Sequence, residues 1–253
     1  MQNYFDKEYE LRYFEIDKTG KASSITMMTL LQETAAEHCY SIGQSLYSLM
    51  NQNLGWVLLS GAMEMSRYPE YKEKIIIRTW LSKYQSIRGI RENIIYDADY
   101  NVIGKAKGLW LFFDIAKRRA KKIPDYFKEK WSYCEDTSLV HDISTKINAL
   151  SFAKYIKKFK VNIYDTDTNE HVNNIRYLQW LIESLPEEIT DNYYLHSIDG
   201  RFLSEAKYGD IIVSSTNKDN KENSFVHAIH VEGKDSPCAT AKTVWKAIKT
   251  NLV

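Results

Sequence analysis

Stretches rich in β-branched and aromatic residues, separated by short polar turns, recur along the whole chain. This pattern predicts antiparallel strands joined by turns, one of which is expected at the sequence DADYN. In the first half the expected strands span residues 55–68, 73–85 and 87–115. In the second half they span residues 193–206, 209–219, 223–235 and 238–248. We therefore expect one antiparallel sheet in each half.

A strand and then an amphipathic helix precede the sheet of each half. In the first half the strand is expected at 9–17 and the helix at 23–43, beginning at Ser23 or Ser24 and ending at Gly43. The apolar residues of this helix fall on one face, which we expect to be buried: Ile25, Met28, Leu31 and Ala35. In the second half the strand is expected at 157–165 and the helix at 172–185.

The shared order of strand, helix and sheet indicates a tandem duplication. Residues 30–34 can be laid over 177–181, and residues 71–80 over 207–216. A polar stretch between the two halves has the composition of a linker. We therefore predict one domain at 1–135, a linker at 136–152 and a second domain at 153–253.

One helix followed by an antiparallel sheet can bury its apolar face only by lying against that sheet. The chain has 253 residues, which is enough for two such domains, each with its own core. We therefore predict an α+β fold, a tandem double hot-dog in which each unit is a long helix wrapped by a curved antiparallel sheet.

Composition narrows the classes of function. The net charge is +1 and acids and bases are mixed, so no global field is present to gather nucleic acid or an anionic membrane. The charged N-terminal residues lack the apolar core of a signal peptide, and no later apolar run is long enough for a membrane span. We therefore expect a cytoplasmic protein.

Metal and cofactor sites are not expected either. The three cysteines are widely separated and form no CxxC pair, which argues against a disulfide framework and a thiolate zinc site. His227 and His230 are three residues apart in an expected strand, so they face opposite sides. No glycine-rich phosphate loop is present. We predict no metal and no cofactor.

Candidate chemistry gathers in the segment YDTDTNEHVNN, just before the second helix. Asp167, Asn169 and His171 are spaced by two, which in an extended segment places their side chains on one face. The helix start near Val172 or Asn173 is expected to offer unpaired backbone N–H groups to a developing negative charge. A simpler interpretation is also open, in which Asp167 and Asn169 form an Asx turn, Asn173 caps the helix and His171 takes no part.

The same block closely resembles the signature of the acyl-[acyl carrier protein] thioesterases, D-x-N-x-H-V-N-N followed by a helix that ends in E-S. Here residues 167–186 read DTNEHVNNIRYLQWLIESLP, and the likeness extends through FEIDKTGKAS, RYPEYKEKIIIRTW, VIGKAKGLWLFFDIAKRR and KIPDYF in the first half. The resemblance implies a double hot-dog enzyme that cuts the thioester between a fatty acyl chain and the phosphopantetheine arm of the carrier protein. It favours catalysis by Asp167, Asn169 and His171, whereas Asp165 and Glu170 lie outside the motif positions and are expected to be solvated.

A second part of the family pattern, L-E-Y-R-R-E-C, matches GRFLSEA at residues 200–206. Glu205 has the place of the glutamate, and Ala206 stands where many relatives carry cysteine. A Cys-His-Asn mechanism is thereby excluded unless another thiol reaches the site. The resemblance then implies that Glu205 activates or positions water while Asp167, with Asn169 and His171, binds and polarises the thioester. Direct attack by Asp167, giving a transient anhydride, stays open.

The matching window of the first half, DKTGKASSITMM, keeps an aspartate and a helix start but has no histidine or asparagine. We therefore expect catalysis in the second half and the acyl pocket in the first, as the resemblance also implies. Flexible thioethers suit the wall of an alkyl pocket, although core packing is the alternative role. The expected pocket residues are Met27, Met28, Trp56, Met63 and Met65.

The expected partner is acyl carrier protein, and no nucleic acid is expected. Basic residues could meet this acidic partner, or could equally form a solvated strand end: residues 117–122 with Arg88, Arg91, Lys105 and Lys107. A homodimer is open, because hot-dog units pair but a tandem duplication can satisfy that pairing within one chain. Two rival functions are an acyl-CoA thioesterase and a non-catalytic acyl-binding module.

Overall fold

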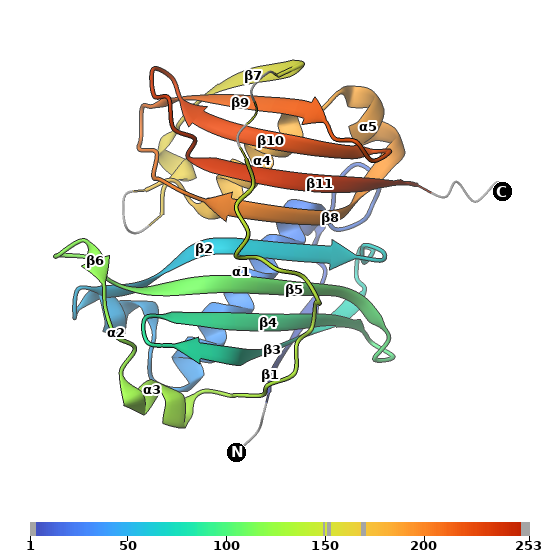
Figure 1. The fold of residues 1–253 in the computed structure, drawn as a ribbon. Helices are drawn as coiled ribbons and strands as arrows, with labels where there is room; N and C mark the ends of the chain where they lie inside the picture. Colours follow the sequence, from blue (N-terminus) through green and yellow to red (C-terminus); the bar gives the residue numbers. More distant parts are fainter. Residues whose placement is uncertain (1–3, 149, 151–152, 168–170, 249–253) are drawn as a thin grey trace. The chain divides into compact units, whose positions relative to one another are not determined.

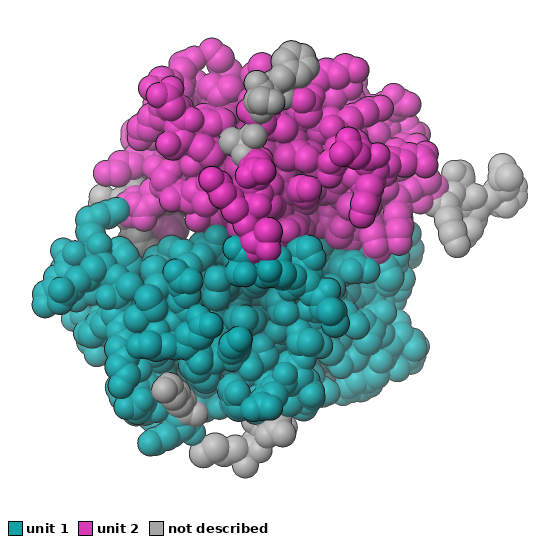
Figure 2. Space-filling model, viewed as in Figure 1, with its two compact units in different colours: residues 1–144 teal, residues 145–253 magenta. Residues whose placement is uncertain are grey.

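The computed structural model describes residues 4–148, 150, 153–167 and 171–248. The chain divides into two compact units, Met1–Ser144 and Thr145–Val253, which Figures 1 and 2 show. The boundary between the units falls inside the stretch that the sequence predicts as a linker. No helix formed by the described residues is long and apolar enough to cross a membrane.

The first unit consists of an antiparallel sheet and one long helix, with two short helices beside them. The strands lie in the order β1-β3-β4-β5-β2, and the short β6 pairs with β5. The strands are β1 (Phe5–Glu10), β2 (Leu54–Met65), β3 (Lys74–Gln85), β4 (Arg88–Asp97), β5 (Val102–Asp114) and β6 (Arg119–Ala120). The helices are α1 (Ser24–Ser41), α2 (Leu46–Met50), α3 (Asp125–Lys130) and the 3-10 turn η1 (Tyr13–Glu15).

The second unit has the same kind of architecture. Its strands lie in the order β8-β11-β10-β9-β7 and are all antiparallel. The strands are β7 (Tyr155–Lys160), β8 (Tyr193–Phe202), β9 (Ile211–Lys218), β10 (Ser224–Val231) and β11 (Ala239–Ala247). The helices are α4 (Asn174–Glu183), α5 (Glu187–Asn192) and the 3-10 turn η2 (Ile163–Asp165).

The ends of α1 follow the sequence signals. The Ser23 hydroxyl accepts a hydrogen bond from the Thr26 N–H at 3.0 Å, so Ser23 is the N-cap. Gly43 follows the last turn with φ of 75° and donates its N–H to the Tyr40 carbonyl at 2.9 Å. Both predicted boundaries of this helix are confirmed.

The predicted buried face of α1 is correct only at Met28, because Ile25, Leu31 and Ala35 are half-buried. The residues of α1 that are buried are Met27, Met28, Leu30, Thr34 and His38. Two of them are polar, and both are satisfied: Thr34 Oγ1 donates to the Leu30 carbonyl at 2.7 Å, and His38 Nδ1 lies 3.0 Å from Arg91 Nη1. An apolar stripe alone could not locate the face, because hydrogen bonding allows these polar residues to be buried.

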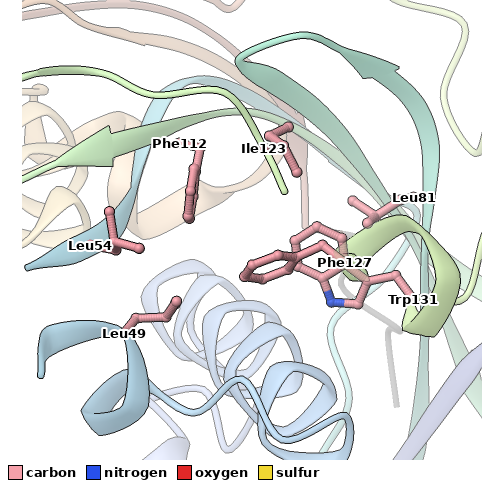
Figure 3. Close-up of a cluster of buried hydrophobic side chains, with 7 residues drawn as sticks. All are labelled: Leu49, Leu54, Leu81, Phe112, Ile123, Phe127 and Trp131. Atoms are coloured by element: carbon pink, nitrogen blue, oxygen red, sulfur yellow. The ribbon is translucent and has the colours of Figure 1, made fainter. Parts of the chain in front are cut away.

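A cluster of buried apolar side chains fills one end of the first unit, and Figure 3 shows these side chains pointing toward one another. The cluster comprises Leu49, Leu54, Leu81, Phe112, Ile123, Phe127 and Trp131. Trp56 packs against it, with its ring centroid 4.8 Å from that of Phe112 and 5.3 Å from that of Trp131. The short helices α2 and α3, which the sequence pattern does not predict, supply part of this core.

The segment after α3, residues 131–144, crosses the face of the first sheet that is turned away from α1 (Figure 1). Glu92, which is only 1% exposed, fixes it: its carboxylate accepts from the Ser138 N–H at 3.1 Å and from the Ser138 hydroxyl at 2.7 Å. Lys107 Nζ lies 3.5 Å from the same carboxylate. Residues up to 144 thus belong to the first unit.

This packing corrects part of the predicted basic surface. Arg91 is only 5% exposed and faces the interior, where it meets His38 and the Thr79 hydroxyl. The side chain of Lys107 is 11% exposed and pairs with Glu92. These two residues were wrongly assigned to an exposed basic surface, because a strand alternates its faces and both point inward under covering segments.

The two units repeat the same backbone hydrogen bonds around the start of their long helices. Ser23 and Asn173 are both N-caps, so the helices match with an offset of 150 residues. Isolated bridges pair Lys21 with Glu70 and His171 with Lys207, so the following segments match with an offset of 137 residues. The sequence alignments of 30–34 with 177–181 and of 71–80 with 207–216 are therefore wrong by three residues and one residue.

Candidate active site

The loop that leads into α4 is closed at both of its ends. Thr166 and Val172 form an antiparallel bridge, and the Asp167 N–H donates to the His171 carbonyl at 2.8 Å. Residues 167 and 171 are therefore close in space, whereas an extended segment of this length would separate their Cα atoms by about 13 Å. The expectation that the motif lies along one extended strand is wrong.

His171 meets Glu205, as the sequence predicts for two groups of one site. Nδ1 of His171 lies 3.3 Å from Oε1 of Glu205, and the two side chains are 22% and 40% exposed. The pair is therefore accessible to a substrate and only partly screened by water. A carboxylate at Nδ1 favours the tautomer that carries its proton there, which leaves Nε2 free to accept a proton.

The peptide of Ala206 joins the two loops that carry this pair. Its carbonyl accepts from the Val172 N–H at 3.1 Å, and its N–H donates to the Tyr177 hydroxyl at 2.8 Å. Tyr177 lies on α4, is 3% exposed and was missed by the sequence analysis. Burial raises the pKa of its phenol, so the hydroxyl stays protonated. A tyrosine on the buried face of a helix needs a hydrogen-bond partner, which was the available signal.

The start of α4 is capped by Asn173, as predicted: its side-chain oxygen accepts from the Ile175 N–H at 3.0 Å. The expected unpaired donors are not those of Val172 and Asn173. The Val172 N–H is bonded to Ala206, and the Asn173 N–H donates to the Asp165 carbonyl at 2.9 Å. Those two groups hold the loop and are unavailable to an oxyanion.

Asp165 is a structural residue, and the expectation that it is solvated is wrong. Its carboxylate accepts from the Asn162 N–H at 2.8 Å and lies 3.3 Å from Arg176 Nε. Only 15% of its side chain is exposed. Asp165 therefore fixes η2 and its contact with α4.

The remaining motif residues are placed less completely. Asp167 is exposed, and its backbone N–H holds the loop at His171. Asn169 and Glu170 lie outside the described residues. The structure thus brings Asp167, His171 and Glu205 into one region of the second unit, and Asn169 stays a prediction.

One cysteine lies near the site without being part of the motif. The Cys238 carbonyl accepts from the Leu203 N–H at 2.7 Å and from the Ser204 N–H at 3.2 Å, just before Glu205. Cys238 is only 1% exposed. Ala206 itself is fully buried and brings no thiol. Among the described residues, no group of three or more histidine, cysteine, aspartate or glutamate side chains could hold a metal ion.

The five expected pocket residues all belong to the first unit. Met27, Met28, Met63 and Met65 are at most 7% exposed, and Trp56 is part of the aromatic packing around Phe112. A role in acyl binding stays a prediction for these residues.

The first unit keeps the loop but not its chemistry. Asp17 donates its N–H to the Lys21 carbonyl at 2.8 Å, as Asp167 does to His171. Lys21 stands in the place of His171, and its Nζ lies 3.5 Å from Glu70. Asp17 also accepts from the Thr19 N–H at 2.8 Å, which is an Asx turn. An Asx turn followed by a helix cap, which was the simpler interpretation of residues 167–173, is thus what the first unit has at Asp17 and Ser23.

Comparison with protein families identifies the chain. The model of the acyl-ACP thioesterase N-terminal domain matches residues 2–131, and that of the acyl-ACP thioesterase C-terminal domain matches residues 150–247. The chain belongs to the acyl-ACP thioesterase family. The resemblance found in the sequence is therefore confirmed.

Curated relatives agree with this membership. The acyl-[acyl-carrier-protein] hydrolase FATB3, chloroplastic, of Cuphea viscosissima is 26% identical over 96% of this chain and 62% of its own length. The oleoyl-acyl carrier protein thioesterase, chloroplastic, of Coriandrum sativum is 27% identical over 89% of this chain and 65% of its own length. The chain spans less than two thirds of the length of these two relatives.

Solved structures confirm the double hot-dog fold. A 12:0-ACP thioesterase from Umbellularia californica has a TM-score of 0.86 at 21% identity and covers 98% of this chain and 99% of its own. An acyl-ACP thioesterase from Bacteroides thetaiotaomicron also has a TM-score of 0.86, at 20% identity, with coverages of 96% and 98%. At these identities the likeness is one of fold.

Proposed function

We propose that this acyl-ACP thioesterase family member hydrolyses the thioester between a fatty acyl group and the phosphopantetheine arm of acyl carrier protein, releasing a free fatty acid. The observation that carries the proposal is the contact of 3.3 Å between His171 Nδ1 and Glu205 Oε1, at positions matching the family motif. Water is the second reactant, and the products are a carboxylic acid and a thiol.

The reaction needs a base for water and an acid for the leaving sulfur. With its proton on Nδ1 facing Glu205, His171 takes a proton from water at Nε2 as the oxygen attacks the acyl carbonyl. The tetrahedral intermediate then breaks its carbon–sulfur bond, and the same nitrogen returns the proton to the thiolate. In this scheme the Asn169 amide donates to the thioester carbonyl and polarises it, and Asp167 helps to bind the substrate.

The second route lets Asp167 attack the carbonyl and form an anhydride, which water then hydrolyses. The two routes differ in one measurable species. Rapid quenching and mass spectrometry of the peptide that contains Asp167 would find an acyl adduct only in the anhydride route. His171 and Glu205 would then activate the water of the second step.

The test compares hydrolysis of one acyl group carried by acyl carrier protein and by coenzyme A. His171→Ala and Asp167→Ala are each expected to lower turnover by at least about a hundredfold, the usual scale for acid-base groups. Lys21→Ala and Asp17→Ala change the matching residues of the first unit and are expected to leave turnover intact. Near-native turnover in either variant of the second unit would contradict the site assignment.

The same assay separates the rival functions. Turnover on coenzyme A alone would identify an acyl-CoA thioesterase, and acyl binding without turnover would identify a binding module. The fatty acids released in a producing host, measured by gas chromatography, would give the preferred chain length. The cytoplasmic location and the homodimer stay predictions, and light scattering would measure the oligomeric state.

A further inference from the structure

Tyr177 is a buried residue of α4 that is hydrogen-bonded to the loop carrying Glu205. We propose that Tyr177 is a positioning residue: its hydroxyl holds the Ala206 peptide and thereby keeps Glu205 against His171. The inference rests on the proposed function, because it assigns Tyr177 a part in the same hydrolysis. It goes beyond the motif residues, since the Tyr177 hydroxyl acts through the Ala206 N–H, to which it is hydrogen-bonded.

The geometry forms a chain of short contacts. Val172, next to His171, donates its N–H to the Ala206 carbonyl at 3.1 Å. Ala206, next to Glu205, donates its own N–H to Tyr177 Oη at 2.8 Å. The backbone N–H and the carbonyl of Ala206 are therefore both hydrogen-bonded. The neighbouring residues Glu205 and His171 are in contact at 3.3 Å.

The Tyr177 side chain is buried among other aromatic rings. The Tyr177 ring is 3% exposed and packs edge-on against Trp180 at 5.8 Å and Phe202 at 6.2 Å between ring centroids. Because the ring is packed between two other aromatic side chains, the position of its hydroxyl is fixed. The Ala206 N–H is bonded to this buried hydroxyl, and a buried donor that is left unpaired is destabilising.

The first unit shows that the loop does not need this bond to close. Its matching carbonyl, that of Pro69, accepts from the Ala22 N–H at 2.8 Å, as Ala206 accepts in the second unit. Pro69 has no N–H, and Met27 stands in the place of Tyr177 and has no hydroxyl. Donor and acceptor are thus both missing from the first unit, which has Lys21 in the place of His171. The bond is found beside the proposed chemistry and not in the shared framework.

Catalysis is sensitive to such positioning, since a misplacement of about 1 Å can cost about a hundredfold in rate. Loss of the hydroxyl is expected to lower kcat by about tenfold or more and to leave KM nearly unchanged, because the bond is internal to the protein. A general loss of stability would lower the amount of active enzyme without this selective effect on kcat.

Three variants test the bond itself. Tyr177→Phe and Tyr177→Met each remove the acceptor hydroxyl, and Tyr177→Met combined with Ala206→Pro also removes the donor, which gives the pair that the first unit has at these places. Ala206→Pro is not made alone, because a proline ring in place of the N–H would collide with a hydroxyl 2.8 Å from that nitrogen. If the hydrogen bond carries the effect, Y177M/A206P loses no more kcat than Y177M. A further loss in the double variant, or wild-type kcat in folded Y177F, would overturn the proposal. Tyr9→Phe is the matched control, since it removes a hydroxyl 2.9 Å from Thr34 Oγ1 in the first unit and is expected to leave kcat unchanged.

A second measurement needs no hydrolysis and so separates this proposal from the proposed function. Diethyl pyrocarbonate modifies neutral imidazole, and mass spectrometry of the peptide gives the rate at His171. Glu205→Gln removes the carboxylate at Nδ1 and is expected to change that rate, and Y177F is expected to change it in the same direction and by a similar factor. A Y177F rate equal to that of the wild type would overturn the positioning role, even in a protein without thioesterase activity.

Discussion

A buried histidine in the second unit is expected to make this protein sensitive to acid. His227 is fully buried on β10, with Nδ1 2.8 Å from the Thr216 hydroxyl and Nε2 2.8 Å from the Thr243 hydroxyl. Burial lowers the pKa of His227 from 6.5 to about 3, because the imidazolium would lose its hydration. The folded protein therefore holds this ring neutral where the unfolded chain binds a proton.

The magnitude follows from proton linkage. Above pH 6.5 both states are neutral at His227, so this residue makes no pH-dependent contribution. Below that pH the unfolded chain gains a proton that the folded unit refuses, and stability falls by about 1.4 kcal/mol per pH unit. At about pH 4.5 the loss is roughly 2–3 kcal/mol, and it continues until the folded pKa of about 3 is reached.

The assay compares wild type with His227→Gln by urea unfolding at about pH 7 and about pH 4.5. The variant loses some stability at both values, because its amide cannot reproduce both contacts of the ring. Its loss between the two pH values is expected to be roughly 2–3 kcal/mol smaller than that of the wild type. Carboxylates and His38 titrate in both proteins and cancel in the difference. Equal losses in the two proteins would show that His227 is not held neutral by the fold.

Three further changes test the packing and the thiols. A Cβ added at Gly104 would lie 2.3 Å from Met65 Sδ, so Gly104→Ala is expected to lower the free energy of unfolding by about 1–3 kcal/mol, measured by thermal unfolding. Gly61→Ala is the control and is expected to lower it less, because the atom nearest to its added Cβ is 3.4 Å away. Glu92→Ala is expected to release the segment that crosses the first sheet, seen as new limited-proteolysis sites between residues 131 and 144; an unchanged digestion pattern would contradict this. A triple variant with serine at Cys39, Cys134 and Cys238 is expected to keep most of its hydrolysis. Severe loss of hydrolysis in this variant, if it is folded, would revive a thiol mechanism.

The sequence predicts elements whose signals are local. The caps Ser23 and Asn173, and the turn at 97–101, are found where propensity places them. Register was harder, because three successive isoleucines from Ile75 can be laid over Ile211 and Ile212 in more than one way. Only the backbone bridges fix it, and a shift of one residue reverses the face of every side chain.

The parts of the site that were missed depend on contacts between distant segments. The bond from Ala206 to Tyr177 joins residues 29 positions apart, and no local pattern marks its donor. The motif gave His171 and Glu205, whose contact the structure shows at 3.3 Å. It could not show that the N–H groups of Val172 and Asn173 are already bonded, since that depends on the fold of the loop.

The first unit offers an economical route for enzyme design. At its two ends its loop has the same backbone hydrogen bond and the same bridge as the second loop, so these contacts form with either set of side chains. Five positions separate the first unit from the proposed site: Thr19, Lys21, Met27, Tyr68 and Pro69 stand where the second unit has asparagine, histidine, tyrosine, glutamate and alanine. A duplicated gene with this property can lose or regain a reaction centre by point substitution, without rebuilding its scaffold.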